Sequence, residues 1–398
     1  MIKTGTIKLS HFSVKEYLLS AHIEEYFRVS EKAAHVKISE ISVAYLLQFD
    51  SFKPLTEDLL NSSPLEKYAA VNWIDHARSG GMAPALLKLI LQLFMSETSF
   101  TNWIWIYNID RWWASQDLSI DKAEVHSPLY YASLAGLEQV SKYLLENEAD
   151  VDAQGGQYSN ALQAASFEGH EVIVKQLLEK GADVNAQGGK YGNALQAASL
   201  EGHEVIVRLL LEKGADVNAQ GGIYGNALQA ASFKGHKVIV RLLLEKGADI
   251  NPQGGQYSNA LQAASLEGHE VIVKLLLEKG ADMNAQAGEY GNALWAASLR
   301  GHEVIVKLLL EKGADVDMQG EHGTALQVAS FTNHEVIVKL LVDEGANVNA
   351  QRGFYGNALQ AASLEGHEAM VKLLLEKGAD VNANMAMQSR QHLQKVMR

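Results

Sequence analysis

Residues 192–218 read GNALQAASLEGHEVIVRLLLEKGADVN, and this stretch decides the fold. Asn193 is a good N-cap residue, because its side-chain oxygen can accept a hydrogen bond from the unpaired N–H groups of the first helical turn. A short helix of small residues is expected to follow and to stop at Gly202. A second helix is expected to run from there to Gly214, since glycine commonly terminates helices. The stretch therefore predicts a pair of short helices.

The second helix of the pair is amphipathic. Its apolar residues recur at a spacing that places them on one side of a helix. One helix pair cannot bury this stripe by itself, whereas stacked copies can bury it between them. The stripe is predicted to consist of Val205, Ile206, Leu209 and Leu210.

The stretch is one copy of an internal repeat. A histidine precedes the second helix of each copy and recurs every 33 residues, with one interval of 32. A degenerate eighth copy starts at residues 127–133 and has Leu137 in the histidine column. We therefore expect eight helix pairs over residues 121–383. The histidines are His170, His203, His236, His269, His302, His334 and His367.

The period and the pattern Gly-His-x-x-x-Val-x-x-Leu-Leu-x-x-Gly-Ala-Asp-Val-Asn closely resemble the ankyrin repeat. This resemblance implies an all-α fold, an ankyrin-repeat solenoid of helix pairs with short β-hairpin loops. It also implies a non-catalytic module that binds a protein partner. Most copies have Asn-Ala-Leu-Gln where the family has Thr-Pro-Leu-His. Asparagine can replace threonine as a cap, and glutamine can still hydrogen-bond where the histidine would.

The copies are nearly identical, and their differences fall in a few columns. In ankyrin proteins these columns face the concave groove and the hairpin tips, so we expect them to contact a protein partner. The hairpin column, directly before a tyrosine in most copies, holds Gln157, Lys190, Ile223, Gln256, Glu289 and Phe354. The column two residues before the histidine holds Glu168, Glu201, Lys234, Glu267, Arg300, Thr332 and Glu365. The column before that holds Phe167, Leu200, Phe233, Leu266, Leu299, Phe331 and Leu364.

Trp295 replaces the glutamine of its column, and two interpretations of it stay open. It is either an exposed aromatic anchor for the partner or a side chain that fills a gap between neighbouring copies. The variable columns likewise admit the interpretation that nothing constrains them.

Composition excludes several classes of function. The chain has 398 residues, a formal net charge of −13 and no cysteine. Disulfides and thiolate metal sites are thereby excluded, and a reducing compartment, the cytoplasm or the nucleus, is expected. An acidic repeat region does not suit nucleic acid, and no apolar run is long enough to span a membrane.

No motif for catalysis or for a cofactor occurs. The glycine-rich loops lack the lysine and the context of a phosphate loop, and there is no nucleophile motif. The repeated histidines stand one to a copy without metal-ligand spacing, so we expect them to form structural hydrogen bonds rather than to bind zinc. We expect no enzymatic activity, no cofactor and no metal.

Residues 1–120 contain no repeat and are expected to form a smaller, mostly helical domain. A strand is expected over residues 6–12, a helix from Ser13, and further helices near 31–49, 64–79 and 84–96. The domain begins abruptly, as the end of a larger domain would. Five tryptophans are expected mostly to pack in its core: Trp73, Trp103, Trp105, Trp112 and Trp113.

Segments 9–18, 41–47 and 68–77 resemble the region that follows the NACHT nucleoside-triphosphatase core in fungal receptors of the signal-transducing ATPase class. This resemblance implies that the array is the sensor portion of a fungal NLR-like receptor. The phosphate-loop motif of the core occurs nowhere in the chain, so nucleotide switching is not assigned to it. The alternatives are a stand-alone scaffold and a self-associating or autoinhibitory protein. Residues 384–398 are expected to form either a helix that caps the array or a remnant where further repeats were lost.

Overall fold

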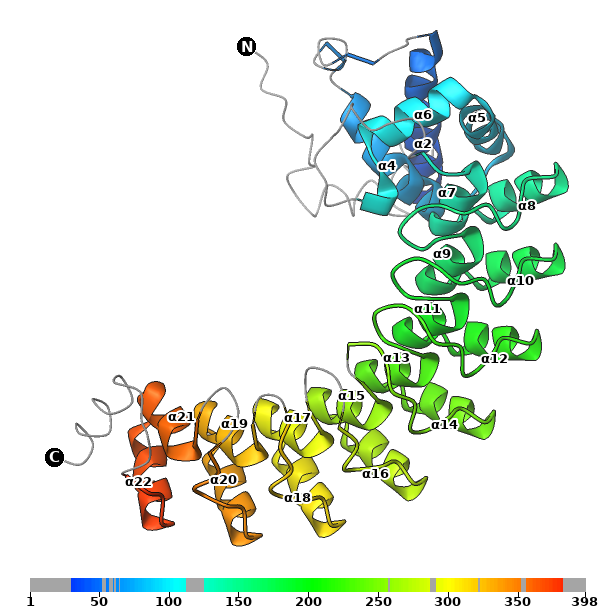
Figure 1. Ribbon diagram of the computed structural model, residues 1–398. Helices are drawn as coiled ribbons and strands as arrows, with labels where there is room; N and C mark the ends of the chain where they lie inside the picture. The colour runs from blue at the N-terminus through cyan, green and yellow to red at the C-terminus, as the bar shows by residue number, and fades with distance from the viewer. Residues whose placement is uncertain are drawn as a thin grey trace, which may run out of the picture. The chain divides into compact units, whose positions relative to one another are not determined.

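The computed structural model describes residues 30–51, 55–56, 60, 62–63, 65–111, 125–256, 258–286, 291–320, 323–351 and 356–381. The chain divides into two compact units, Met1–Gly156 and Gln157–Arg398. In the described residues every regular element is helical, apart from three isolated β-bridges in loops. The predicted all-α class is confirmed (Figure 1).

The first unit begins with a bundle of helices. Ser30 caps its first helix by accepting from the Ala33 N–H at 3.3 Å, and a proline occupies the first turn of another, where its missing N–H costs nothing. The helices predicted near 31–49, 64–79 and 84–96 are confirmed, whereas α6 was not predicted. The elements are α2 (Glu31–Leu47), η2 (Gln48–Ser51), α4 (Glu66–Gly80), α5 (Pro84–Met95), α6 (Glu97–Ile106) and η3 (Ile109–Arg111), followed by the first helix pair, α7 (Pro128–Leu134) and α8 (Glu138–Glu146).

Two tryptophans form the centre of this bundle. Trp73 and Trp103 are fully buried, and their rings meet edge to face with centroids 5.4 Å apart. The Trp103 Nε1–H donates to the backbone oxygen of Ala70 at 3.1 Å, so this polar group is satisfied inside the core. The expected core role of these two residues is confirmed, and Trp105 is half-buried. The expected strand, the helix from Ser13, Trp112 and Trp113 lie outside the described residues.

The second unit consists of helix pairs stacked along the chain. First helices pack on the first helices of neighbouring copies, and second helices form a separate row (Figure 1). The pairs are α9 (Ala161–Glu168) and α10 (Glu171–Glu179), α11 (Ala194–Glu201) and α12 (Glu204–Glu212), α13 (Ala227–Lys234) and α14 (Lys237–Glu245), α15 (Ala260–Glu267) and α16 (Glu270–Glu278), α17 (Ala293–Arg300) and α18 (Glu303–Glu311), α19 (Ala325–Phe331) and α20 (Glu335–Asp343), and α21 (Ala358–Leu364) and α22 (Glu368–Glu376).

The first helix of each pair starts as the sequence predicts. The Asn193 side chain accepts from the Gln196 N–H at 2.8 Å, and the Gln196 side chain accepts from the Asn193 N–H at 3.1 Å, which makes a capping box. The Gln196 amide also donates at 3.0 Å to the backbone oxygens of Ala219 and Gly225 in the next copy. One side chain therefore caps its own helix and joins two copies, which explains why glutamine can stand in this column.

The histidine column joins each copy to the one before it. His203 Nε2 lies 2.8 Å from the backbone oxygen of Phe167, and His236 Nε2 lies 2.9 Å from that of Leu200. Because a carbonyl can only accept, Nε2 carries the proton. The expected structural role of these histidines is confirmed. The same bond is made by His269, His302, His334 and His367.

The apolar stripe of the second helix is rotated from its predicted position. In α12 the buried residues are Ile206, Val207 and Leu210, whereas Val205 is 53% exposed and Leu209 is half-buried. The prediction for Val205 was wrong, because the side of the apolar run that packs on the neighbouring helices includes Val207 and leaves Val205 in solvent. Five other copies expose the equivalent valine.

Candidate partner-binding surface

The ends of the first helices and the loops before them form one surface of the second unit, which we call the inner surface. Its loops are tight turns closed by the bridges Gly188↔Gly192, Gly221↔Gly225 and Gly320↔Gly323. Gly192 and Gly225 have φ near 90°, a conformation that glycine adopts without strain. The tips of successive loops are thereby held side by side.

The loop tips are hydrogen-bonded to one another along the array. The Lys190 N–H donates to the Gln157 oxygen at 3.0 Å, the Ile223 N–H to the Lys190 oxygen at 3.1 Å, and the Gln256 N–H to the Ile223 oxygen at 2.8 Å. These four residues belong to the variable hairpin column. Hydrogen bonds fix their backbone, so the differences among these four copies reside in the side chains.

An aromatic ladder runs along the same side. Tyr158 and Tyr191 stack with ring centroids 5.8 Å apart, and Tyr191 and Tyr224 stack at 6.4 Å. Phe167 joins the ladder at 4.8 Å from Tyr158 and 4.7 Å from Tyr191, and Phe233 lies 5.4 Å from Tyr224. The rings from Tyr158 to Phe233 therefore form one continuous row across three neighbouring copies.

Burial and nearby acidic side chains raise the pKa values of two tyrosines of the ladder. Burial raises the pKa of Tyr191 above 10.0, and Tyr224 and the carboxylates of Glu201 and Glu168 raise it further, against a hydrogen bond from Gln157. Burial also raises the pKa of Tyr224, and Glu201 and Glu267 add to it. The carboxylates from the ends of the first helices therefore lie close enough to the ladder to influence its hydroxyl groups. The Lys190 ammonium lies 5.5 Å from the Tyr191 ring centroid, so a cation also reaches the ladder.

The predicted partner-contact residues differ in exposure. The exposed residues are Glu168, Lys190, Lys234, Gln256, Glu267, Arg300, Leu364 and Glu365. Half-buried are Gln157, Phe167, Glu201, Ile223, Phe233, Leu299, Phe331 and Thr332. Glu289 and Phe354 lie outside the described residues. The exposed and the half-buried residues remain candidates for contact with a partner.

Three predicted contact residues are buried and require correction. Leu200 and Leu266 are each 2% exposed, so these leucines fill the core where phenylalanine in other copies reaches the surface. Trp295 is 5% exposed, and its environment corresponds to the space-filling interpretation rather than to an exposed anchor. Side chains with so little surface cannot give a partner the contact area of a binding hot spot.

The tyrosines of the ladder were not among the predicted contact residues. They stand in a column that hardly varies, and variation between copies was the criterion for selection. Their recurrence directly after each variable tip residue was the available signal. Only the structure shows that Phe167 and Phe233 extend this column into a continuous ladder.

A comparison with known protein families identifies the same repeats in the sequence. The family model described as "Ankyrin repeats (3 copies)" matches the overlapping stretches 112–188, 129–221, 162–254, 222–287, 261–352 and 294–385. The chain belongs to the ankyrin-repeat family. Ankyrin repeats are protein-interaction modules, so the expected general role of the array is confirmed.

Two other proteins are similar to parts of the chain. Azaphilone pigments biosynthesis cluster protein L of the fungus Monascus ruber is 40% identical over 175 residues, which make up 39% of this chain and 37% of that protein. The chain thus spans less than two thirds of the length of this relative. The crystal structure of the human ASB11 ankyrin repeat domain aligns with a TM-score of 0.49 and 28% identity, covering 55% of this chain and 98% of that one.

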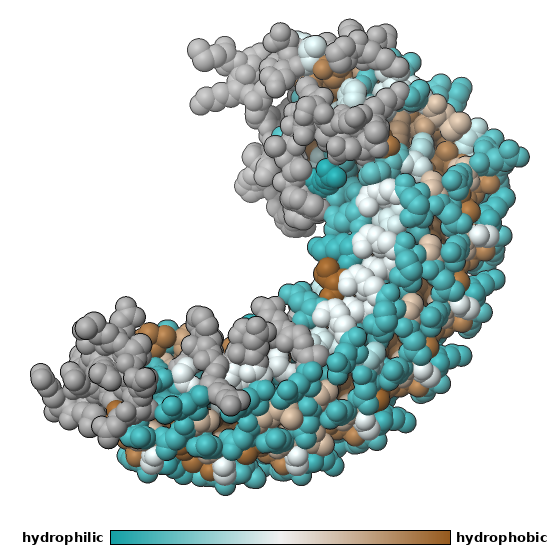
Figure 2. Space-filling view, in the orientation of Figure 1, coloured by the Kyte–Doolittle hydropathy of each residue, from teal (hydrophilic) through white to brown (hydrophobic). Residues whose placement is uncertain are grey.

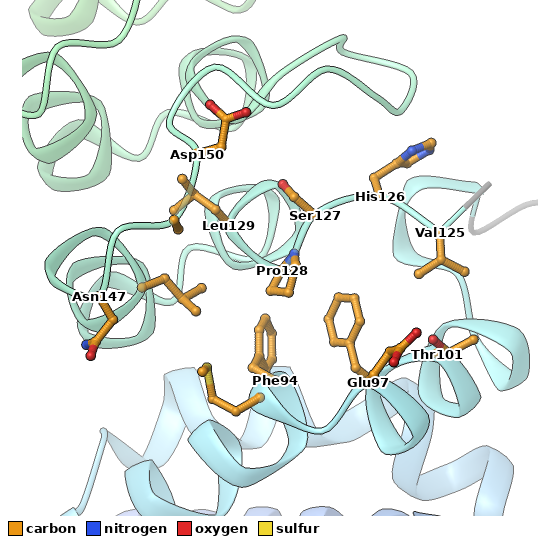
Figure 3. Close-up of a pocket in the computed structure, with 14 residues that line it drawn as sticks. Phe94, Glu97, Thr101, Val125, His126, Ser127, Pro128, Leu129, Asn147 and Asp150 are labelled. Atoms are coloured by element: carbon orange, nitrogen blue, oxygen red, sulfur yellow. The ribbon is translucent and has the colours of Figure 1, made fainter. Parts of the chain in front are cut away.

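A pocket of about 540 Å³ lies in the first unit, between α5 and α6 on one side and the first ankyrin helix pair on the other (Figure 3). Phe94 and Pro128 lie on opposite walls, and the carboxylates of Glu97 and Asp150 lie at its edges. The Ser127 hydroxyl in its wall accepts from the Tyr130 N–H at 3.2 Å and so serves as a helix cap. The pocket is mainly apolar and offers no nucleophile paired with a base. Its lining comes from separate segments, none of them a motif, so the sequence did not indicate it.

Within the described ranges, no three histidine, aspartate or glutamate side chains cluster as metal ligands would. Among those same residues, no helix combines the length and the apolar character needed to cross a bilayer.

Proposed function

We propose that the ankyrin array binds a protein partner through the inner surface, with the loop tips and the ends of the first helices making the contacts. The observation that carries this proposal is the location of the sequence differences. Copies that are otherwise nearly identical differ at exposed positions of this one surface, such as Lys190, Lys234 and Gln256. Differences needed only for packing would instead fall at buried positions.

Site-specific photo-crosslinking in the full chain tests this proposal. A benzophenone amino acid replaces Lys190 or Lys234 on the inner surface, and a matched control replaces Lys274, an exposed lysine of α16. Irradiation in a fungal cell extract should give discrete protein adducts from the two inner positions and none from Lys274. Adducts from Lys274 alone, or from no position of a folded chain, would contradict the proposal.

We further propose that the chain is the sensor portion of a fungal NLR-like receptor. The segments 9–18, 41–47 and 68–77 support this through their resemblance to the region after a NACHT core, and the Monascus relative supports a fungal setting. Determination of the full 5′ end of the transcript tests it. An in-frame phosphate-loop motif upstream is expected, and stop codons directly above Met1 would leave a stand-alone ankyrin protein instead.

A second candidate function, self-association, is favoured by a column of exposed valines on the second helices. Figure 2 shows hydrophobic spots separated by hydrophilic side chains on this face. Equal spacing of identical residues would let two copies pair through several contacts at once. Substitution of lysine at three of these valines should then lower the mass observed in sedimentation at micromolar concentration. A wild-type chain that is monomeric at all concentrations would exclude this function. The valines, 44–56% exposed, are Val172, Val205, Val238, Val271, Val304 and Val336.

A further inference from the structure

The inner surface carries a definite order of charges. The last residues of α9, α11, α13, α15 and α17 occupy equivalent positions in consecutive ankyrin repeats. Their charges read acidic, acidic, basic, acidic, basic. Among the described residues, no salt bridge joins any two of Glu201, Lys234, Glu267 and Arg300, so these four charges are not neutralised within the column. The five residues are Glu168, Glu201, Lys234, Glu267 and Arg300.

The aromatic ladder beside these charges sets a length scale. Equivalent tyrosines are 5.8 and 6.4 Å apart. An extended chain rises about 3.3 Å per residue and points alternate side chains to the same side, so its equivalent side chains recur every ~6.6 Å. A strand-like segment lying along the ladder can therefore place one side chain on each of the three repeats that contain Tyr158, Tyr191 and Tyr224. An α-helix has no such match, because its residues return to one face at about 5 or 10 Å.

The ladder also supplies apolar contact for charged partner residues. The rings of Tyr158, Phe167 and Tyr224 stack against Tyr191, and its hydroxyl group interacts with Gln157. Tyr191 is half-buried, so the edge of its ring remains for contact with a partner. Lysine and arginine side chains can lay their methylene groups against such edges while the charged end reaches a carboxylate. Glu168 directly follows Phe167, whose ring lies 4.8 Å from Tyr158 and 4.7 Å from Tyr191. The carboxylates of Glu168 and Glu201 raise the pKa of Tyr191, and those of Glu201 and Glu267 raise the pKa of Tyr224, so the acidic residues act on the same tyrosines.

We propose that the inner surface of the repeats from α9 to α17 binds an extended peptide segment of a partner, whose alternate residues read basic, basic, acidic, basic, acidic. This inference rests on the proposed function, since it assumes that the inner surface is the binding surface. It adds the conformation of the bound segment and the charge that faces each repeat. Like charges placed opposite one another disfavour other orders, so the column selects among partners rather than only attracting them.

A reciprocal charge exchange tests the inference. The double variant E201K/K234E exchanges two neighbouring charges and keeps the composition and net charge of the protein. The probes are two fluorescein-labelled peptides of identical composition, KTKTETKTE, which matches the wild-type order, and KTETKTKTE, which matches the exchanged order. Threonine fills the alternate positions because it favours extended structure. The reversed sequence of each peptide is also measured, because the direction of the bound segment is not fixed by the charges.

Binding is measured by fluorescence anisotropy on the full chain. In one chain direction the wild type should bind the first peptide roughly fivefold to tenfold more tightly, since two exposed ion pairs are replaced by two repulsive contacts. The double variant should reverse this preference, and salt should shrink it in both proteins. Circular dichroism and urea unfolding should be unchanged, since both substituted side chains are at least partly exposed.

Other outcomes separate the two proposals. Equal binding of both peptides by both proteins, or no binding of either, overturns the charge order. If crosslinks from Lys190 and Lys234 still form, the inner surface binds a partner by other means, and the proposed function stands. If neither crosslinks nor peptide binding are found with a folded chain, both proposals fail together.

Discussion

Gly202 ends α11 in the left-handed region of backbone space, with φ of 85°, and the next repeat closes over it. A Cβ atom added there would lie 2.5 Å from Cε1 of His236. The His236 ring cannot move away freely, because its Nε2 donates to the Leu200 oxygen. Gly214 has nearly the same φ, 89°, but an added Cβ would meet nothing within 4 Å. A comparison of these two glycines therefore distinguishes the cost of backbone strain from the cost of a steric clash between repeats.

Gly202→Ala should therefore destabilise the array more than Gly214→Ala. Both substitutions cost about 1–2 kcal/mol for the left-handed conformation, and Gly202→Ala additionally displaces His236 and weakens its hydrogen bond, adding about 1 kcal/mol. Urea unfolding of both variants measures the difference. Equal losses would show that the His236 contact contributes nothing.

Single residues also decide how neighbouring repeats are joined. Gln262 in α15 donates to the oxygens of Ala285 and Gly291 in the next copy, just as Gln196, two copies earlier, donates to those of Ala219 and Gly225. Trp295 replaces this glutamine in α17 and cannot form the amide bridge, so the following contact relies on a buried indole instead. The joint that follows the copy containing Trp295 therefore differs in chemistry from the joints that glutamine makes.

At the scale of elements, α2 and α4 meet through two histidines. His35 Nδ1 and His76 Nδ1 are 2.7 Å apart, and the Tyr68 hydroxyl lies 2.9 Å from His76 Nε2. Burial lowers the pKa of His76 below 6.5, and His35 lowers it further, whereas Asp75 acts in the opposite direction. Positive charges on both of these neighbouring rings would repel each other, so the contact between the helices favours neutral His76.

The His76 contact should make the first unit less stable in mild acid. Because the folded pKa is depressed, the unfolded chain binds the proton first, so stability falls as pH falls from 6.5 toward the folded pKa. NMR titration should show His76 titrating below 6.5, and His35→Gln should move its pKa upward. An unchanged His76 titration in His35→Gln would mean that His35 does not influence it.

At the scale of the whole molecule, stability is organised by nearest neighbours. Within the second unit each helix packs on its own partner and on the equivalent helix of adjacent repeats. The stability of such an array is a sum of contributions from single repeats and from contacts between neighbours, so a destabilising substitution affects mainly the adjacent repeats. The first unit instead packs α2, α4, α5 and α6 around a shared aromatic core.

Leu276→Ala should consequently loosen the middle of the array and leave its ends protected. Leu276 is fully buried in α16, and its truncation should cost about 2–5 kcal/mol. Hydrogen exchange should accelerate mainly from α15 to α18, with little change in α9 and α10. The matched control is Val271→Ala, at an exposed position of the same helix, where the loss should stay below about 0.5 kcal/mol. Uniform acceleration throughout the second unit would instead indicate one cooperative block.

The sequence by itself determined the repeat, the helix boundaries and the structural role of the histidines. Those features depend on local chemistry that each copy repeats: an asparagine cap, a glycine stop and a histidine that always reaches the same carbonyl. The variable columns were found from the sequence as well, because an alignment of near-identical copies shows directly which positions differ. The helix pairs of such a protein can be predicted from the sequence because no contact between distant copies is needed to form each pair.

Only the tertiary structure decided what each copy shows to solvent. The rotation of the second helices exposed Val205 and buried Val207, and the fit between first helices buried Leu200 and Trp295. The stacking of Tyr158, Tyr191 and Tyr224 likewise depends on how far apart neighbouring copies lie at their loops. Rotation and spacing arise from packing between repeats, and the pattern within one repeat contains neither.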